Sequence, residues 1–214
     1  MEFVHTSVLS VLFAITASNA SIFDFEDQAQ TTIGGVRSGA HTSLTLEDDG
    51  LEMTIYRSSG AAFDIFPNNT FGPDPVFMPP VTWMNNSWDP FWDVSQTDDT
   101  IILNFSSMVS DFSFRFGDFG DDDDDIYIEG YAGLDGTGDL VDSNYEFLEG
   151  NDTFEFTSGA LLLTGALRSV VIFTGGDFTN SIFIDNIRAT GVPSAPSLAI
   201  LGMGALVGTR RRRA

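Results

Sequence analysis

The sequence predicts an all-β protein, an antiparallel β-sandwich of the jelly-roll kind, and three observations lead to this prediction. Apolar and polar residues alternate with a period of two over many short segments, which is typical of strands with one buried face. Turn-forming Gly, Asp and Asn residues separate these segments. Twenty phenylalanines among 214 residues supply enough apolar surface for one core between two packed sheets.

The first part of the chain, residues 1–20, is predicted to be a signal peptide. Its apolar stretch is followed by Ser18 and Ala20, the small residues expected before a signal-peptidase cleavage site. The segment departs from the usual pattern because it carries Glu2 and no Lys or Arg near its start. A buried first strand or helix is the alternative interpretation.

Residues 21–190 are predicted to form the β-sandwich. In residues 51–56, Leu51, Met53 and Ile55 would share the buried face. Further expected strands are 101–105, 110–117 (with Phe112, Phe114 and Phe116 on one face), 125–132, 152–157, 169–174 and 181–187. Residues 160–168 are the one candidate for a helical turn, and the lack of a fixed short repeat argues against a parallel β-helix.

Composition excludes several classes of function. The chain has 31 acidic residues against 9 arginines and a net charge of −22, which disfavours nucleic acid and anionic lipid as partners. It contains no Cys and two His, which leaves little material for a catalytic triad or a zinc centre. Glycoside hydrolases use a pair of carboxylates, but in a chain with this many acidic residues some carboxylates are paired by chance. The number of acidic residues therefore does not indicate a glycoside hydrolase. We therefore predict that the protein is not an enzyme.

All three tryptophans, Trp83, Trp88 and Trp92, lie in a Pro- and Asn-rich segment that is expected to be a long loop, residues 67–100. Exposed aromatic rings beside Asn and Asp side chains suit the stacking and hydrogen bonding of sugars. Alternatively, the loop folds its tryptophans over one end of the sandwich as a plug, which is the simpler interpretation.

A second unusual segment is acidic. Asp118 and a run of five aspartates that begins at Asp121 supply hard oxygen ligands, so Asp118, Asp121 and Asp123 are candidate ligands for Ca²⁺. The spacing does not fit an EF-hand loop, whose sixth and twelfth positions would be Ile126 and Ala132. A solvated acidic turn between two strands is the simpler interpretation.

The last part of the chain, residues 191–214, begins with a Pro-containing motif and continues with an apolar run, residues 198–207. A helix of ten residues is about 15 Å long, whereas a bilayer core is about 30 Å thick, so this run is a marginal membrane span. The cluster of arginines that follows the apolar run is expected to stay on the cytoplasmic side of the membrane, which places the domain outside the cell. The cluster consists of Arg210, Arg211, Arg212 and Arg213.

This tail resembles the PEP-CTERM sorting signal of Gram-negative bacteria. The matching residues before the apolar run are Val192, Pro193 and Pro196, although Val-Pro-Ser-Ala-Pro stands where the family has Val-Pro-Glu-Pro. The resemblance implies export, processing by an exosortase-like enzyme, transient anchoring in the inner membrane, and a final location at the outer surface or outside the cell. An ordinary tail anchor and an apolar C-terminal strand are the alternatives.

A looser resemblance concerns the two ends of the domain. The segments FDFED (residues 23–27) and IFIDNI (residues 182–187) resemble the first and last strands of jelly-roll carbohydrate-binding modules. The resemblance implies neighbouring terminal strands and a structural Ca²⁺ held by Glu26 and Asp185.

Together these observations predict a non-enzymatic, exported cell-surface or matrix protein that associates with extracellular polysaccharide. One alternative is a carbohydrate-binding module that uses the segment from Trp83 to Trp92. An extracellular enzyme acting on glycosides is the least favoured alternative.

Overall fold

The computed structural model describes residues 20–25, 41–67, 86–89, 99–119, 123–150, 156–176 and 183–192. These residues form eleven strands and no helix, and every pairing between the strands is antiparallel, so the predicted all-β class is confirmed. The strands are β1 (Ala20–Phe23), β2 (Ser43–Asp48), β3 (Leu51–Arg57), β4 (Asp64–Pro67), β5 (Asn86–Asp89), β6 (Ile101–Phe119), β7 (Asp124–Tyr131), β8 (Leu140–Leu148), β9 (Phe156–Leu163), β10 (Leu167–Gly176) and β11 (Phe183–Gly191).

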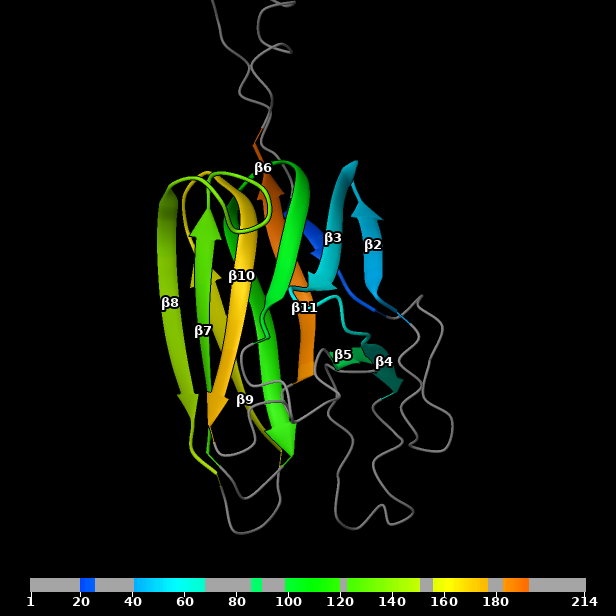
Figure 1. Ribbon diagram of the computed structural model, residues 1–214, viewed down its shortest axis with the longest axis vertical. Helices are drawn as coiled ribbons and strands as arrows, with labels where there is room; N and C mark the ends of the chain where they lie inside the picture. The colour runs from blue at the N-terminus through cyan, green and yellow to red at the C-terminus, as the bar shows by residue number, and fades with distance from the viewer. Residues whose placement is uncertain are drawn as a thin grey trace, which may run out of the picture.

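The strands form two layers that pack face to face as a sandwich (Figure 1). The front layer has the order β8–β7–β10–β6–β3–β2. In the back layer β6 lies between β9 and β11, β11 also pairs with β1 and β5, and β4 pairs with β5.

Strand β6 belongs to both layers. Its first half pairs with β3 and β10, its second half pairs with β9 and β11, and the strand folds over the end of the sandwich between them (Figure 1). Asp111, near the fold, has a left-handed φ of 51°. The sequence pattern predicted two separate strands here, because the alternation of apolar residues is interrupted at residues 106–111, where the chain changes layer.

The core consists of the side chains that point inward from both layers. Met53 and Ile55 of β3 are fully buried, as predicted, and so is the Phe112–Phe114–Phe116 series of β6. Successive rings of that series lie 5.8 Å and 6.0 Å apart between centroids, and Phe112 also contacts Phe105 at 5.8 Å. Tilted aromatic contacts of this kind add to the area that the rings bury.

Two predictions about local structure are wrong. Residues 160–168 do not form a helical turn; they comprise the end of β9, a turn with Gly165 at a φ of 107°, and the start of β10. Leu161 and Leu163 are buried at alternate positions of β9, which is the strand period. The segment 67–100 is not a loop throughout, because it contains β5.

The terminal strands of the domain are neighbours, as the resemblance to carbohydrate-binding modules implies. Strand β1 pairs with β11 from Ala20 opposite Thr190 to Phe23 opposite Ile187. Just before this pairing, the register of β11 against β6 shifts after Asp185, and Asn186 adopts a φ of 52°. The Asp-Asn pair noted in the sequence is therefore a β-bulge.

Among the described residues, no helix has the length and apolar character needed to cross a membrane. Residues 1–19 of the predicted signal peptide (residues 1–20) and the apolar run 198–207 lie outside the described residues, whereas Ala20 begins β1.

Candidate functional site

All four tyrosines of the chain lie on one side of one layer. Tyr56 is on β3, Tyr127 and Tyr131 are on β7, and Tyr145 is on β8. We call the outward side of the front layer the tyrosine face; it faces the viewer in Figure 1. Its aromatic members are Tyr56, Tyr127, Tyr131, Tyr145, Phe147 and Phe173.

Strand register places three of these rings in a row. Tyr145 lies opposite Tyr127, and Tyr127 lies opposite Phe173, on the adjacent strands β8, β7 and β10. Since neighbouring strands are about 4.8 Å apart, the row extends over about 10 Å. The Tyr127 and Phe173 ring centroids are 5.7 Å apart. Tyr145 and Phe147 are 52% and 49% exposed, so this end of the row is open to solvent.

A carboxylate accepts a hydrogen bond from each tyrosine hydroxyl. Tyr56 donates to Asp135 Oδ1 at 2.5 Å. Tyr127 donates to Glu129 Oε1 at 3.0 Å, and Tyr131 donates to the other oxygen of the same carboxylate. In the fourth contact of this kind, Tyr145 donates to Asp125 Oδ2 at 3.4 Å. These contacts fix the orientation of the rings on the sheet.

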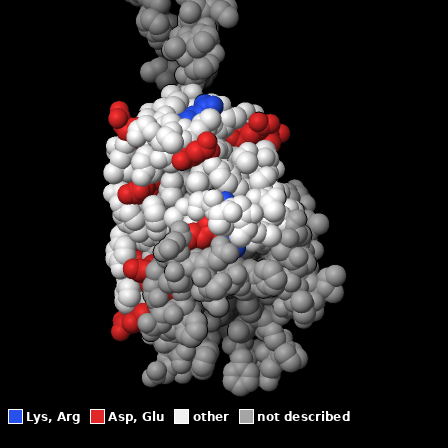
Figure 2. All heavy atoms as spheres, viewed as in Figure 1, with Lys and Arg blue, Asp and Glu red and all other residues white. Residues whose placement is uncertain are grey.

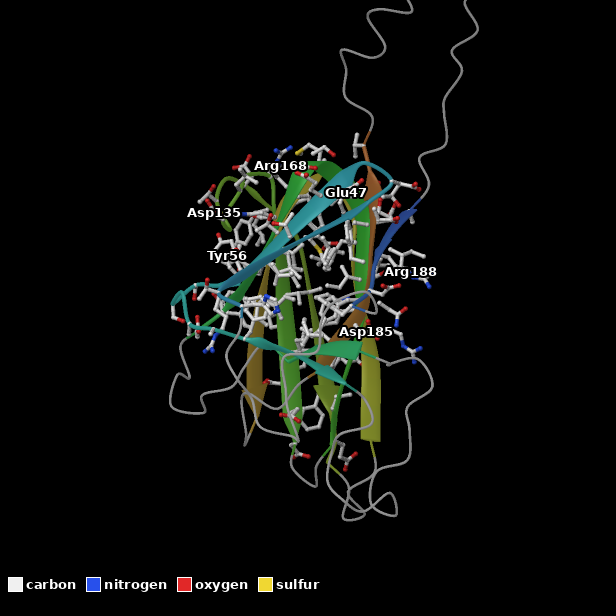
Figure 3. The ribbon with its side chains drawn as sticks, turned by 90° about the vertical axis from the view of Figure 1, so that its right-hand side faces the viewer. Glu47, Tyr56, Asp135, Arg168, Asp185 and Arg188 are labelled. Carbon is white, nitrogen blue, oxygen red and sulfur yellow. The ribbon has the colours of Figure 1, made fainter. Side chains whose placement is uncertain are left out.

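The loop between β7 and β8, residues 132–139, folds back over the tyrosine face. The Ser169 hydroxyl on β10 accepts from the Gly136 amide at 3.0 Å and donates to the Gly133 carbonyl at 2.7 Å. Farther across the sheet, the Asp135 amide donates to Asn104 Oδ1 on β6 at 2.9 Å. The Asp135 carboxylate then reaches Tyr56 on β3, as Figure 3 shows. The loop thus crosses two strands to meet a third.

The environment shifts the pKa values of these groups in opposite directions. Burial and the hydrogen bond to Asp135 raise the pKa of Tyr56 to about 12. The hydrogen bond to Glu129, together with burial, raises the pKa of Tyr131 to about 12. Hydrogen bonds from Tyr56 and Asn104 hold the pKa of Asp135 below its usual value. At neutral pH these phenols are therefore neutral donors, and Asp135 is ionised.

The tyrosine face is acidic. Figure 2 shows acidic side chains spread over its described part. Its outward positions carry Glu52, Asp125 and Glu129, and Asp135 reaches it from the loop. The described arginines lie elsewhere: Arg57 is buried, Arg168 lies at the end of the sandwich, and Arg115 and Arg188 are exposed on the back layer (Figure 3).

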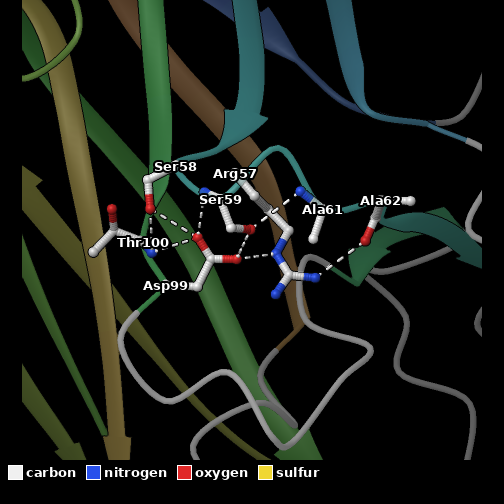
Figure 4. Close-up of polar contacts among 7 residues, drawn as sticks. All are labelled: Arg57, Ser58, Ser59, Ala61, Ala62, Asp99 and Thr100. Atoms are coloured by element: carbon white, nitrogen blue, oxygen red, sulfur yellow. Dashed lines mark hydrogen bonds and ion pairs between the residues drawn. The ribbon is translucent and has the colours of Figure 1, made fainter.

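A buried ion pair lies under the edge of the tyrosine face (Figure 4). Arg57 Nε is 2.6 Å from Asp99 Oδ2, and both side chains are 1% exposed. Ser58 and Ser59 donate three more hydrogen bonds to Asp99, at 2.5 to 2.9 Å. Arg57 also donates to the Ala62 carbonyl at 3.1 Å. This network joins the end of β3 to the chain that enters β6.

Of the three tryptophans in the predicted ligand site, the structure describes only Trp88. Trp88 is part of β5, where its backbone pairs with Ile65 and with Ile184 in the back layer. Trp83 and Trp92 lie outside the described residues. The tryptophan ligand site therefore stays a prediction.

The predicted calcium ligands are distributed over two regions. Asp118 is near the end of β6, and Asp123 precedes β7 and accepts a hydrogen bond from the Gly150 amide at 2.9 Å. Asp185 is buried in β11, and its Oδ1 accepts from the Asn186 amide at 2.6 Å. Asp121 and Glu26 lie outside the described residues.

Calcium usually takes six to eight oxygen ligands. The part of the chain that the structure describes contains no group of three or more His, Asp or Glu side chains that could hold a metal ion. Two of the predicted ligands, Asp121 and Glu26, lie outside these residues, so calcium binding stays a prediction.

Of the predicted sorting residues, Val192 alone is described. Its amide donates to the Met108 carbonyl at 2.8 Å, and its side chain is 38% exposed at the end of the sandwich. The other members lie outside the described residues: Pro193, Pro196, Arg210, Arg211, Arg212 and Arg213.

The sequence analysis missed the tyrosine face, although part of the signal was present. In the segment DIYIEGY, Tyr127, Glu129 and Tyr131 alternate with the buried Ile126 and Ile128, so they share one outward side. The other members come from distant strands and a loop, and only the sheet order brings them to the same surface.

No protein-family model matches the chain, and no curated protein matches it in sequence. Several solved structures are similar in architecture. The K2 cleaved adhesin domain of Lys-gingipain has 12% identity and a TM-score of 0.44, with 80% of this chain and 99% of that chain covered. The CBM22-1 xylan-binding domain from Paenibacillus barcinonensis has 11% identity and a TM-score of 0.40, with 85% of this chain and 100% of that chain covered.

A third similar structure is the family 11 carbohydrate-binding module from Clostridium thermocellum, in complex with a β-1,3-1,4-mixed-linked tetrasaccharide. It has 9% identity and a TM-score of 0.36, with 83% of this chain and 98% of that chain covered. At such identities and TM-scores, these similarities carry no information about the ligand of this chain.

Proposed function

We propose that this chain is an exported, non-catalytic domain that binds extracellular polysaccharide on its tyrosine face. The observation that carries the proposal is the row formed by Tyr145, Tyr127 and Phe173 on an open sheet, with a carboxylate beside each tyrosine hydroxyl. The apolar faces of sugar rings stack on aromatic rings, and sugar hydroxyls hydrogen-bond to carboxylates.

An open face suits an extended polymer. The row spans three adjacent strands, and its outer end is exposed at Tyr145 and Phe147. A chain of sugars lying across the strands would meet one ring after another. Nucleic acid, the other common extended polymer, is disfavoured because its phosphates would meet the negative charge of the face.

The carboxylates of the tyrosine face suit binding better than hydrolysis. Glycoside hydrolases need one carboxyl group that holds a proton and a second that is free to attack or to activate water. Asp135 is held ionised by Tyr56 and Asn104, which opposes a role as general acid. Both oxygens of Glu129 already accept hydrogen bonds from tyrosines.

The export part of the proposal is supported by the sequence. It comprises a signal peptide, transient anchoring in the inner membrane of a Gram-negative cell, and processing by an exosortase-like enzyme. Mass spectrometry of the protein from its host should show an N-terminus near Ser21 and a C-terminus without the arginine cluster. A cytosolic product with both original ends intact would contradict export.

The binding part is tested by calorimetric titration of a panel of polysaccharides into the protein. Tyr145→Ala should weaken binding about tenfold or more, because an exposed aromatic anchor is lost from the row. Leu162→Ala is the matched control, since Leu162 is 50% exposed on β9 in the back layer. Failure of every polysaccharide to bind would refute the proposal.

The tryptophan segment is the second candidate site, because Trp83, Trp88 and Trp92 lie within ten residues of sequence among Asn and Asp neighbours. Tryptophan fluorescence recorded in the same titrations separates the two sites. A fluorescence change on binding, with an unaltered affinity in Tyr145→Ala, would move the binding site from the tyrosine face to this segment.

A further inference from the structure

We propose that the tyrosine face selects glycans that carry protonated amino groups, such as polymers of glucosamine, over neutral and acidic glycans. This inference rests on the proposed function, because it names the class of polysaccharide that the same face binds. It follows from the charge of the face and from the position of its carboxylates relative to its rings.

The first argument is charge complementarity. The outward positions of the front layer carry the carboxylates of Glu47, Glu52, Asp125 and Glu129, and the loop adds Asp135. The described outward positions of this face carry no arginine. Like charges repel, so uronic acids and sulfated sugars should bind this face less favourably than neutral or cationic glycans do.

Strand pairing adds a second observation. Glu47 on β2 and Glu52 on β3 lie directly opposite each other in the antiparallel register. Two like charges at such a position destabilise the sheet. A cationic ligand nearby would relieve this repulsion, whereas a neutral ligand would leave it unchanged.

The third argument is the arrangement of rings around a charge. Glu129 lies between Tyr127 and Tyr131 on the same side of β7, with one oxygen bonded to each hydroxyl. An ammonium group above this site meets a carboxylate that lies beside two aromatic rings, and both kinds of group attract cations. Neutral sugar hydroxyls gain less, because they must share oxygens that already accept hydrogen bonds.

Asp135 keeps its negative charge at mildly acidic pH, where amino sugars are protonated. Hydrogen bonds from Tyr56 and Asn104 keep the pKa of Asp135 below its usual value. The two raised tyrosine pKa values keep Tyr56 and Tyr131 in the neutral form up to strongly alkaline pH. Over this range Tyr56 and Tyr131 are therefore neutral donors, and Asp135 carries a negative charge beside Tyr56.

A strongly acidic protein attracts any polycation, so the test must separate the tyrosine face from the net charge of −22. Three hexasaccharides of equal length are titrated into the whole chain at two salt concentrations: a hexamer of glucosamine, its N-acetylated counterpart and a hexauronate. We expect the glucosamine hexamer to bind at least tenfold more tightly than the N-acetylated one (about 1.4 kcal/mol). The hexauronate should not bind.

Two charge variants locate the effect. Glu129→Gln should lower the preference for the glucosamine hexamer at least threefold. Asp49→Asn, the matched control, removes the same charge from an exposed turn where Asp49 has a φ of 50°, a conformation that Asn accepts, and should leave the preference unchanged. A hexalysine peptide should not displace the bound sugar.

The outcomes separate the two proposals. Equal affinities for the glucosamine and N-acetylated hexamers would overturn the charge inference and leave polysaccharide binding intact. Equal losses of preference in Glu129→Gln and Asp49→Asn, or displacement by hexalysine, would also overturn it, because the attraction would then be unspecific. If no glycan of any charge binds, both proposals fail.

Discussion

Two neighbouring residues of β3 each donate to an aspartate that is distant in sequence, but they do so in opposite environments. Tyr56 points outward and donates to Asp135, which is 79 positions away in sequence. Arg57 points inward and binds Asp99, which is 42 positions away. The first pair lies on the tyrosine face, whereas both side chains of the second pair are 1% exposed.

Because of this difference in burial, we expect the Arg57–Asp99 pair to matter for stability and the Tyr56–Asp135 pair to matter for binding. A buried charge that loses a partner is poorly solvated, so removal of either member of the Arg57–Asp99 pair should destabilise the fold strongly. If an exposed carboxylate such as Asp135 loses its partner, water replaces the hydrogen bond at little cost. The outward pair can therefore be altered, or can bind a ligand, without loss of the fold.

The largest expected effect is on the buried pair. Asp99→Ala removes the carboxylate that the buried Arg57 guanidinium contacts at 2.6 Å, and we expect a loss of about 3–5 kcal/mol in the free energy of unfolding. Denaturant titration followed by circular dichroism measures it. Asp135→Asn, the control on the outward side, keeps a residue that accepts the φ of 58° at this position and should cost about 1 kcal/mol or less. Similar losses in both variants would remove the distinction between the two pairs.

The next effect concerns the loop that carries Asp135. A Cβ on Gly133 would lie 2.6 Å from the backbone oxygen of Thr137, so Gly133→Ala must displace the loop. We expect a loss of about 1–3 kcal/mol in stability and a weaker affinity for glycans. The pKa of Tyr56 should fall from about 12 towards 10, which absorbance titration would detect. An unaltered Tyr56 titration would show that the loop does not control this contact.

Acid should affect the buried pair more than the binding face. Burial alone would raise the pKa of Asp99, but hydrogen bonds from Ser59 and Ser58 and the charge of Arg57 hold it below its usual value. The unfolded chain therefore binds the proton more tightly, and stability should be lost below about pH 4, by about 1.4 kcal/mol per pH unit for each proton. Denaturant titrations at several pH values measure how steeply the free energy of unfolding falls with pH. This dependence should be weaker in Asp99→Ala, and an equal dependence in both proteins would exclude Asp99 as its source.

The smallest effect on stability is expected from Tyr56→Phe, which removes one partly exposed hydrogen bond at a cost of about 1 kcal/mol or less. Absorbance titration should show two tyrosines with a pKa of about 12 in the unmodified chain and one, Tyr131, in the variant. Asp135→Asn should shift the Tyr56 titration only partly towards 10, because burial is the larger cause. If the Tyr56→Phe variant still contained two tyrosines with a pKa of about 12, the assignment of one of these pKa values to Tyr56 would be wrong.

Much of the fold could be predicted from short segments of sequence. The alternation in residues 51–56 and 110–117 predicted which side chains of β3 and β6 are buried, because a strand places successive side chains on opposite sides. The Asp-Asp-Gly turn at residues 48–50 could also be predicted, and Asp49 and Gly50 have the positive φ values that such a turn requires.

The candidate site could be predicted only in part. Alternation in β7 places Tyr127, Glu129 and Tyr131 on one side, but it does not tell which strands lie beside β7. Tyr145 joins the row because β8 pairs with β7 in one particular register, and a shift of one residue would turn it inward. The Asp135–Tyr56 contact depends on the path of a loop across two strands, which leaves no periodic signal.

The sequence by itself therefore determined the class of structure and, in strands with clear alternation such as β3 and the second half of β6, which side chains point inward, because these depend on local backbone geometry and on hydrophobicity. The acidic character and the absence of cysteine chemistry were also set by composition alone. Only the tertiary structure decided that β6 serves both layers and that all four tyrosines share one face. These features arise from pairings between distant segments, and the free energy of such pairings depends on the whole core and not on any one stretch of chain.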